Sequence, residues 1–76
     1  MPDDNLSGGL GLTVRRLRQE AGLSQEALAD AAGLDRAYIS GLERGRRNPT
    51  LASLTRIATA LGVPLHDLMK EAEERR

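Results

Sequence analysis

Polar side chains recur at helical spacing in one short stretch of the chain. Arg36 and Arg44 are eight residues apart with Ser40 between them, so the three would lie on one face of a helix. The guanidinium group is planar and donates paired hydrogen bonds that match phosphate oxygens and the edge of guanine. Ala37 and Gly41, beside them, are small enough to let the helix backbone approach another surface. The chemistry indicated is non-covalent binding of a phosphate-bearing partner.

A second group of polar side chains flanks this stretch. After it comes the segment RGRRN, which contributes Arg44, Arg46, Arg47 and Asn48. Such a loop can straddle a phosphate backbone. Before it, Ser24 and Gln25 begin an earlier helix, whose first N–H groups and glutamine amide would form a second phosphate-binding position. Capping by Ser24 with a solvated Gln25 accounts for that pair equally well.

Basic residues are concentrated, although the chain as a whole is neutral. Eleven Lys and Arg balance eleven Asp and Glu. Residues 15–47 hold seven arginines against five carboxylates, which leaves an acidic excess of two elsewhere. This balance argues against a partner held by bulk charge alone and indicates a locally basic face.

Other kinds of site lack the residues that they need. The chain has no cysteine and one histidine, so it can form no disulfide and no metal cluster. No nucleophile and base pair is evident, and we expect no enzyme activity, cofactor or small-molecule ligand. No segment approaches the roughly 20 apolar residues of a membrane span, and the start MPDDNLSGG is acidic. We therefore expect a soluble, cytoplasmic protein with no membrane partner.

Five amphipathic segments must position these side chains. Apolar residues recur at helical spacing in each, and the expected helices span about residues 10–21, 25–32, 36–44, 51–61 and 65–72. Caps are expected at Ser24, Asp35 and Thr50, and helix stops at Gly22, Gly33 and Gly62. Only three residues, 33–35, separate the second helix from the third, which is helix-turn-helix spacing. No strand pattern occurs, so the expected fold is all-α.

The expected organisation is a single domain, because 76 residues cannot bury two cores. Residues 1–9 lack periodicity and contain turn formers, so we expect a flexible arm. Residues 10–72 form the helix-turn-helix domain, and residues 73–76 a charged tail.

The third helix is weakly anchored by its own core residues, since Ile39 and Leu42 are its main apolar side chains. Its outward face is therefore informative, and its N-terminal end is the one that would enter a DNA major groove. Base-reading positions on this face would be Arg36, Ala37, Ser40 and Gly41. The alternative is a solvated face with a glycine that costs about 1 kcal/mol of helix stability. The two polar flanks favour the groove interpretation.

The segment LSQEALADAAGLDRAYISGLERGRRNPTLASLTRIATALGV resembles the lambda-repressor-like (XRE-type) helix-turn-helix DNA-binding regulators. Within it, DRAYISGLERGRRNPT is similar to restriction-modification controller proteins, small dimeric regulators of their own operons and of the restriction gene. The resemblance covers about residues 10–70. It rests on shared residues at Gln25, Leu28, Ala29, Gly33, Ile39, Leu42 and Glu43. It implies a five-helix lambda-repressor-like fold and a transcriptional regulator that binds double-stranded DNA sequence-specifically.

The resemblance also implies roles for individual residues. Arg36 matches a position that reads bases. DNA backbone contacts are implied at Ser24, Gln25, Tyr38 and Arg47. The resemblance also pairs Arg18 with Glu43 in a structural ion pair that orients the third helix. Controller proteins usually have a polar residue at the position of Ala37. Alanine cannot donate or accept a hydrogen bond there, so only contact with a thymine methyl remains. Tyr38 could equally cover the core.

Pairing of two copies follows from the expected function, because one helix in one groove selects a site poorly. The C-terminal helices carry more apolar residues than the last helix of so small a bundle can bury: Val63, Leu65, Leu68 and Met69. These four residues would form a homodimer interface, as the resemblance also suggests, or else complete the monomer core. The alternative function is a protein-interaction module, antitoxin-like or coactivator-like, with incidental DNA affinity.

Overall fold

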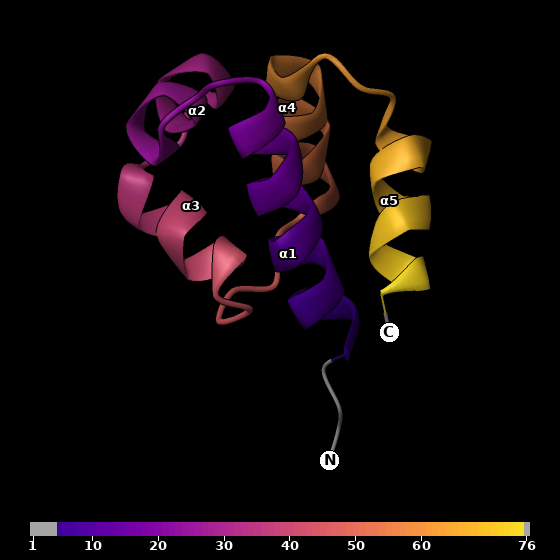
Figure 1. The fold of residues 1–76 in the computed structure, drawn as a ribbon. Coiled ribbons are helices and arrows are strands. Elements are labelled where there is room, and N and C mark those ends of the chain that lie inside the picture. The colour runs from indigo at the N-terminus through magenta and orange to yellow at the C-terminus, as the bar shows by residue number, and fades with distance from the viewer. Residues whose placement is uncertain (1–4, 76) are drawn as a thin grey trace.

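The computed structural model describes the backbone of residues 5–75 and the side chains of residues 8–75. Within that range the chain folds into five α-helices and no strand, which confirms the predicted all-α fold (Figure 1). The helices are α1 (Asn5–Glu20), α2 (Gln25–Ala32), α3 (Arg36–Glu43), α4 (Leu51–Leu61) and α5 (Leu65–Glu74).

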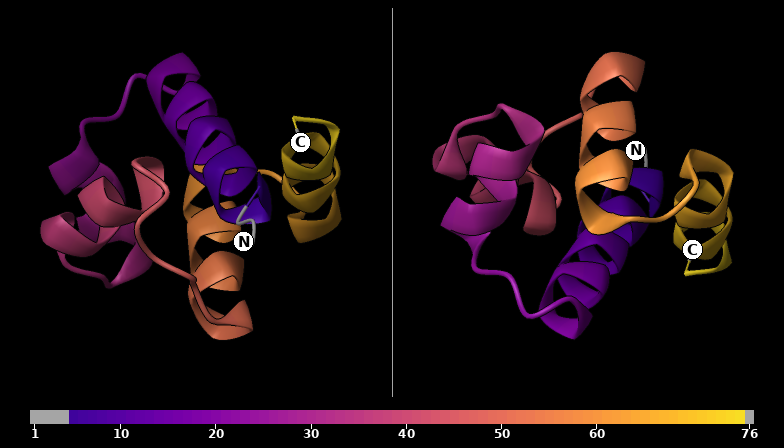
Figure 2. Two further views of the ribbon diagram at one scale, coloured as in Figure 1. Left: turned by 90° about the horizontal axis from the view of Figure 1, so that it is seen from below. Right: turned by 90° about the horizontal axis from the view of Figure 1, so that it is seen from above.

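Helix α1 lies between the helix-turn-helix pair and the last helix. α2 and α3 lie on one side of α1, and α5 runs antiparallel to it on the other side (Figure 1). Views from below and above show that α4 crosses α1 between these two groups (Figure 2). α1 packs against α3 and α5, whereas α4 packs against α2 and α5. This arrangement leaves α3 at the outer edge of the bundle.

The core is aliphatic, as the composition predicts. Every helix contributes at least one fully buried side chain, and the largest are Val14, Leu28, Ile39, Leu42, Ile57 and Leu68. Burying one such side chain contributes about 1.5–3 kcal/mol to folding. Tyr38, the single aromatic residue of the chain, packs against the edge of this core and stays partly exposed.

The predicted three-residue turn joins the end of α2 to the start of α3. The Ser24 hydroxyl accepts a hydrogen bond from the backbone N–H of Ala27 at 3.0 Å and caps α2. Gly33 ends α2 in the left-handed conformation, with φ of 69°. Asp35 occupies the N-cap position of α3, but its side chain makes no capping hydrogen bond. The expectation that its carboxylate caps α3 is therefore wrong.

Helix α1 begins five residues before the predicted start. Residues 5–9, expected as part of a flexible arm, are helical, and residues 1–4 lie outside the described residues. A Cβ added to Gly9 would lie 2.3 Å from a carbonyl oxygen of α5, and one added to Gly11 would lie 2.3 Å from a carbonyl oxygen of α3. These glycines allow α1 to approach both helices closely, so tertiary packing overrides their low helix propensity.

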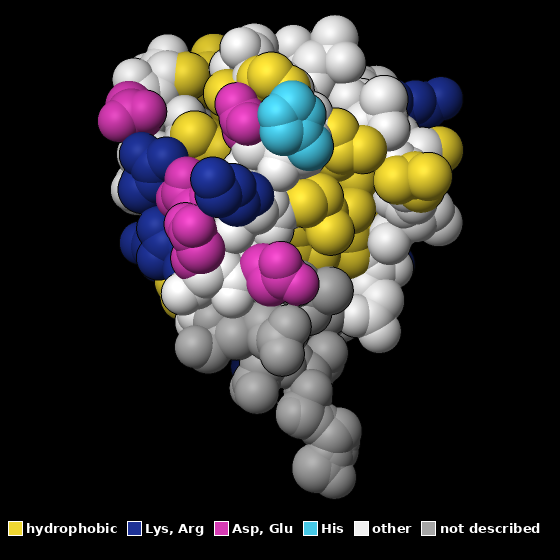
Figure 3. All heavy atoms as spheres, turned by 90° about the vertical axis from the view of Figure 1, so that its right-hand side faces the viewer, with side chains coloured by type: hydrophobic (Ala, Val, Ile, Leu, Met, Phe, Trp, Pro, Cys, Tyr) yellow, Lys and Arg dark blue, Asp and Glu magenta, His cyan; other side chains and the backbone are white. Residues whose placement is uncertain are grey.

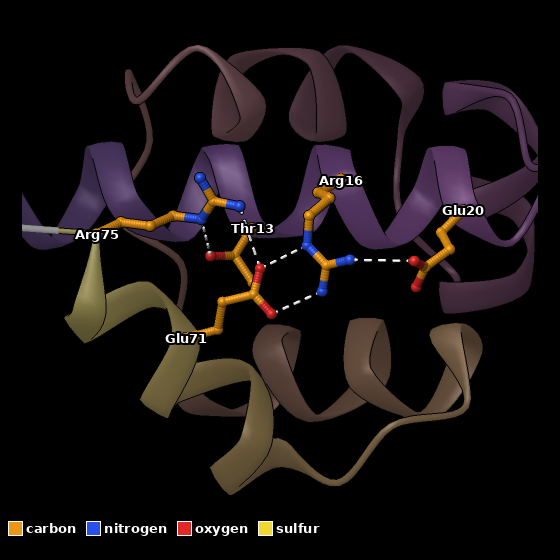
Figure 4. A network of polar contacts seen from close by, with 5 residues as sticks. All are labelled: Thr13, Arg16, Glu20, Glu71 and Arg75. Atoms are coloured by element: carbon orange, nitrogen blue, oxygen red, sulfur yellow. Dashed lines mark hydrogen bonds and ion pairs between the residues drawn. The ribbon is translucent and has the colours of Figure 1, made fainter.

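The end of the chain packs back on α1 as well. α5 includes Glu73 and Glu74, which we expected in a charged tail, and Arg76 lies outside the described residues. Arg75 donates from Nε to the hydroxyl of the buried Thr13 at 3.1 Å (Figure 4). The tail prediction is therefore wrong for residues 73–75, because contacts across 62 positions of sequence hold this segment in place.

Glu71 is the centre of a polar network that joins α5 to α1 (Figure 4). Its carboxylate accepts hydrogen bonds from Nε and Nη2 of Arg16 at 2.6 and 2.7 Å, and one from Arg75 at 3.1 Å. Arg16 also donates to Glu20 at 3.2 Å. Hydrogen bonding from Arg16 is the main cause that lowers the pKa of Glu71 and, reciprocally, the bond to Glu71 raises the pKa of Arg16.

Candidate nucleic-acid interface

The outer face of α3 carries three of the four residues expected to read bases. Arg36 and Ala37 are exposed at its N-terminal end, and Ser40 is partly exposed one turn later. Ile39 and Leu42 are fully buried on the opposite side, which fixes how the helix is rotated. Gly41 is buried, however, so the expectation that it is exposed for base reading is wrong.

A buried ion pair joins α3 to α1. Nε of Arg18 lies 2.6 Å from Oε2 of Glu43, and Nη2 lies 3.1 Å from Oε1, so the pair expected from the resemblance is present with two hydrogen bonds. The side chains are 12% and 3% exposed. Arg18 also donates from Nη1 to the carbonyl oxygen of Leu23 at 2.8 Å. A buried charge needs such partners, because it has given up its hydration.

Gln25 connects this ion pair to the leading end of α3. Its Nε2 donates to Oε1 of Glu43 at 3.1 Å, and its Oε1 accepts from Nη1 of Arg36 at 3.5 Å. A continuous line of polar contacts therefore runs from Arg18 in α1 to Arg36 at the start of α3. The bond to Arg36 is long and exposed, so it is weak and leaves that side chain accessible.

The same contacts change the interpretation of Gln25. We expected a solvated amide that could face a phosphate, whereas the amide of Gln25 is partly buried and engaged at both ends. Ser24 is exposed, and its hydroxyl caps α2. The first N–H groups of a helix have no acceptor within that helix, so the start of α2 retains donors beside α3.

The loop after α3 carries the other cations. The N–H of Arg46 donates to the carbonyl of Gly41 and the N–H of Gly45 to that of Leu42, each at 2.9 Å. Gly45 has φ of 73°, and the two bonds form a Schellman motif that turns the chain sharply. We call residues 44–48 the arginine loop. Its exposed side chains are those of Arg44, Arg46, Arg47 and Asn48.

Tyr38 has both environments that the sequence left open. One part of its side chain packs against the aliphatic core. The guanidinium carbon of Arg47 lies 5.2 Å from the centroid of its ring, within the range of a cation–π contact. The core and the arginine loop therefore meet at this ring.

The C-terminal helices leave an apolar area on the face opposite α3. Leu68, expected in a dimer interface, is 1% exposed and completes the monomer core, so that expectation is wrong for it. Val63, Leu65 and Met69 are only partly buried. A shallow hollow on α5 is lined by Leu65, His66, Met69, Lys70 and Glu73. Figure 3 shows the hydrophobic area on this face, with the histidine and charged side chains at its edge.

Sequence reasoning missed the residues that hold α5 on α1. Arg16 and Glu71 are 55 positions apart, and no spacing rule relates them. The sequence holds one signal for the close approach of α1 to α5 at Gly9 and to α3 at Gly11, namely a glycine-rich stretch beside an amphipathic segment. We interpreted that stretch as part of an arm and its boundary.

Some kinds of site are not found. Among residues whose side chains are described, no group of three or more His, Cys, Asp or Glu side chains is arranged to hold a metal ion. No helix in the described part of the chain has the length and apolar character needed to cross a membrane.

Comparison with known proteins gives a consistent group of relatives. A family model described as Helix-turn-helix matches residues 14–68. The chain is 45% identical over 65 residues to an uncharacterized HTH-type transcriptional regulator, y4dJ, of Sinorhizobium fredii, which covers 86% of this chain and 84% of that protein. It is also 45% identical over 60 residues to the control protein C.BamHI of Bacillus amyloliquefaciens, covering 78% of this chain and 74% of the relative.

Solved structures agree with these sequence relatives. The crystal structure of the restriction-modification controller protein C.AhdI from Aeromonas hydrophila superposes with a TM-score of 0.80 and 45% identity. The match covers 82% of this chain and 94% of that one.

Proposed function

The chain belongs to the helix-turn-helix family of DNA-binding transcriptional regulators, and from this we propose that it binds operator half-sites as a homodimer with α3 in the major groove. The observation that carries the proposal is the outer face of α3. This face presents the exposed Arg36 at its N-terminal end, beside Gln25, while the arginine loop follows at its other end. No enzyme activity is proposed, since these relatives are regulators.

Base reading is proposed for Arg36, Ala37 and Ser40. An arginine at the leading end of a recognition helix can donate two hydrogen bonds to O6 and N7 of guanine. Its side chain is exposed and only weakly bound to Gln25, which supports this role because it can reach a base edge. Ala37 offers a methyl group to thymine, and Ser40 a hydroxyl one turn further along.

Contacts to the DNA backbone are proposed on both sides of α3. On one side the exposed loop would supply Arg44, Arg46, Arg47 and Asn48. On the other side Ser24 and Gln25 lie at the start of α2, where backbone N–H groups and the helix dipole favour phosphate. Tyr38 would lie with Arg47 at the edge of the groove. Such contacts fix the register of the protein on the duplex.

The homodimer is proposed to form through the apolar area of the C-terminal helices. Val63, Leu65 and Met69 are partly buried in the monomer, so part of their apolar surface remains available to a second copy. Pairing through this face would leave α3 of each copy free on the far side. A homodimer that binds two half-sites needs its recognition helices about 34 Å apart, so that they meet successive turns of the major groove.

A role as a restriction-modification controller is proposed from the relatives C.AhdI and C.BamHI, each similar over most of its length. We also propose a cytoplasmic location, since these relatives come from bacteria, where the DNA target would lie in the cytoplasm. The alternative of a protein-interaction module with incidental DNA affinity is not supported, because these relatives are transcriptional regulators or controller proteins.

The test is selection of bound sequences from a random duplex pool, followed by anisotropy titrations at several salt concentrations. We expect an enriched site with two related halves about one helical turn apart, and an affinity that falls with salt. If the protein bound no duplex even at low ionic strength, the proposed DNA interface would be refuted. A single enriched half-site would refute only the homodimer.

A further inference from the structure

Arg47 follows an unusual path for an exposed arginine. The Schellman motif after α3 reverses the chain, so the Arg47 side chain runs back along the helix that it has just left. Its stem crosses Gly41, and its guanidinium group ends over the ring of Tyr38, one turn nearer the start of α3. The side chain is thus held along α3 at two points.

Gly41 is the residue that makes this path available. A Cβ added there would lie 3.0 Å from Cγ of Arg47, 3.7 Å from Nε and 4.0 Å from Cδ. These three atoms are the nearest neighbours of that Cβ, and the first contact is tighter than ordinary van der Waals distance. Even a methyl group at position 41 would require Cγ of Arg47 to move by a few tenths of an ångström, and a larger side chain would displace the arginine stem further.

The backbone gives no other reason for a glycine at this position. The glycines with positive φ in the described chain are Gly22, Gly33, Gly45 and Gly62, and Gly41 is not among them. An alanine would suit this helical conformation better, since glycine is a poor helix former. The space above the backbone is therefore the property that distinguishes glycine here.

We propose that Gly41 is a positioning residue for DNA binding: by leaving room for the Arg47 stem, it holds the guanidinium against Tyr38, and the two side chains meet DNA as one preformed group. This inference rests on the proposed DNA interface. Preorganisation matters because an unrestrained arginine loses rotamer freedom when it binds, which weakens affinity. Gly41 itself makes no contact with DNA in this proposal.

The test compares Gly41→Ala with Gly8→Ala. Gly8 is also a helical glycine without positive φ, and a Cβ there would meet nothing within 4 Å. Both variants should melt cooperatively at or above the parent temperature, because alanine favours the helix. Only Gly41→Ala should bind DNA more weakly, by about two- to tenfold, the effect of freeing one long side chain.

Tyrosine fluorescence provides a readout that does not require DNA. Tyr38 is the single tyrosine and the chain has no tryptophan, so quenching by neutral acrylamide reports on this ring alone. Displacement of Arg47 should increase quenching in Gly41→Ala and in Arg47→Ala, and leave it unchanged in Gly8→Ala. Parent-like quenching in Gly41→Ala would overturn the proposal even if the protein never bound DNA.

A double-variant cycle separates positioning from direct obstruction. If Gly41 acts through Arg47, then Gly41→Ala added to Arg47→Ala should cause no further loss of affinity. A further loss of similar size would mean that the new methyl group itself obstructs DNA, and would overturn the proposal. An unfolded Gly41→Ala would overturn it too, since Arg47 is the neighbour that a Cβ meets.

Discussion

Replacing Glu43 by glutamine should destabilise the fold strongly. The carboxylate is 3% exposed and accepts two hydrogen bonds from Arg18 and one from Gln25. The substitution keeps the shape but leaves the charge of Arg18, which is 12% exposed, without its counter-ion. Removing one partner of a buried pair costs about 3–5 kcal/mol. Arg18 keeps its bond to a backbone carbonyl and some access to water, so we expect about 2–3 kcal/mol.

That loss is large for a chain of 76 residues, whose total stability is about 4–11 kcal/mol. For a domain of this size, each 1 kcal/mol lowers the melting temperature by about 4–8 °C. The expected decrease for Glu43→Gln is therefore about 8–24 °C. Thermal unfolding followed by far-UV circular dichroism measures it, with urea unfolding as an independent estimate.

Glu71→Gln is the matched control. Glu71 also accepts two hydrogen bonds from one arginine, but it is 28% exposed and that arginine is 42% exposed. Ion pairs that solvent reaches contribute little, so the shift should be clearly smaller than for Glu43→Gln. Equal shifts in the two variants, or a shift of only a few degrees for Glu43→Gln, would refute the reasoning from burial.

Further predictions concern the interface, the helix contacts and pH. Arg36→Ala should lower specific affinity by about 1–3 kcal/mol and relax base choice, whereas Arg47→Ala should weaken all sequences alike and reduce the salt slope by about one, as competition titrations will measure. Leu65→Glu should dissociate the proposed homodimer without loss of helical signal, measured by sedimentation equilibrium; an unchanged mass would exclude this face. Gly11→Ala should prevent cooperative melting, because its Cβ would lie 2.3 Å from a carbonyl oxygen of α3. The depressed pKa of Glu71 contributes stability that is complete above the ordinary carboxyl value of 4.5 and is lost as pH falls through the lower folded value. The acid unfolding of Glu71→Gln should therefore be less steep than that of the parent, as monitored by circular dichroism.

The five helices and the helix-turn-helix were predictable from sequence because their signals are local. Apolar residues at helical spacing mark each segment, and Ser24, Gly33 and Gly62 set helix ends through backbone geometry that these residues favour. The exposure of Arg36 and Ala37 also followed, since Ile39 and Leu42 fix which side of α3 faces the core. Pairing of Arg18 with Glu43 came from family resemblance, not from spacing.

Predictions from sequence failed where another element changed the environment of a residue. Gly41 lies at an outward position of α3, yet Arg47 of the following loop covers it. Leu68 was expected at a surface, and packing of α5 against α1 and α4 buries it. Gln25 looked solvated at the start of α2 until α3 brought Glu43 beside it.

Local pattern and tertiary packing thus determined different properties of this chain. Periodicity, caps and composition determined that it is an all-α bundle that carries arginines on and after its third helix, because these properties depend on neighbours within one or two turns. Where α1 begins, what covers Gly41 and which partners hold Glu43 were decided only in the folded state. Those properties depend on distances between elements far apart in sequence, and such distances exist only once the helices have packed.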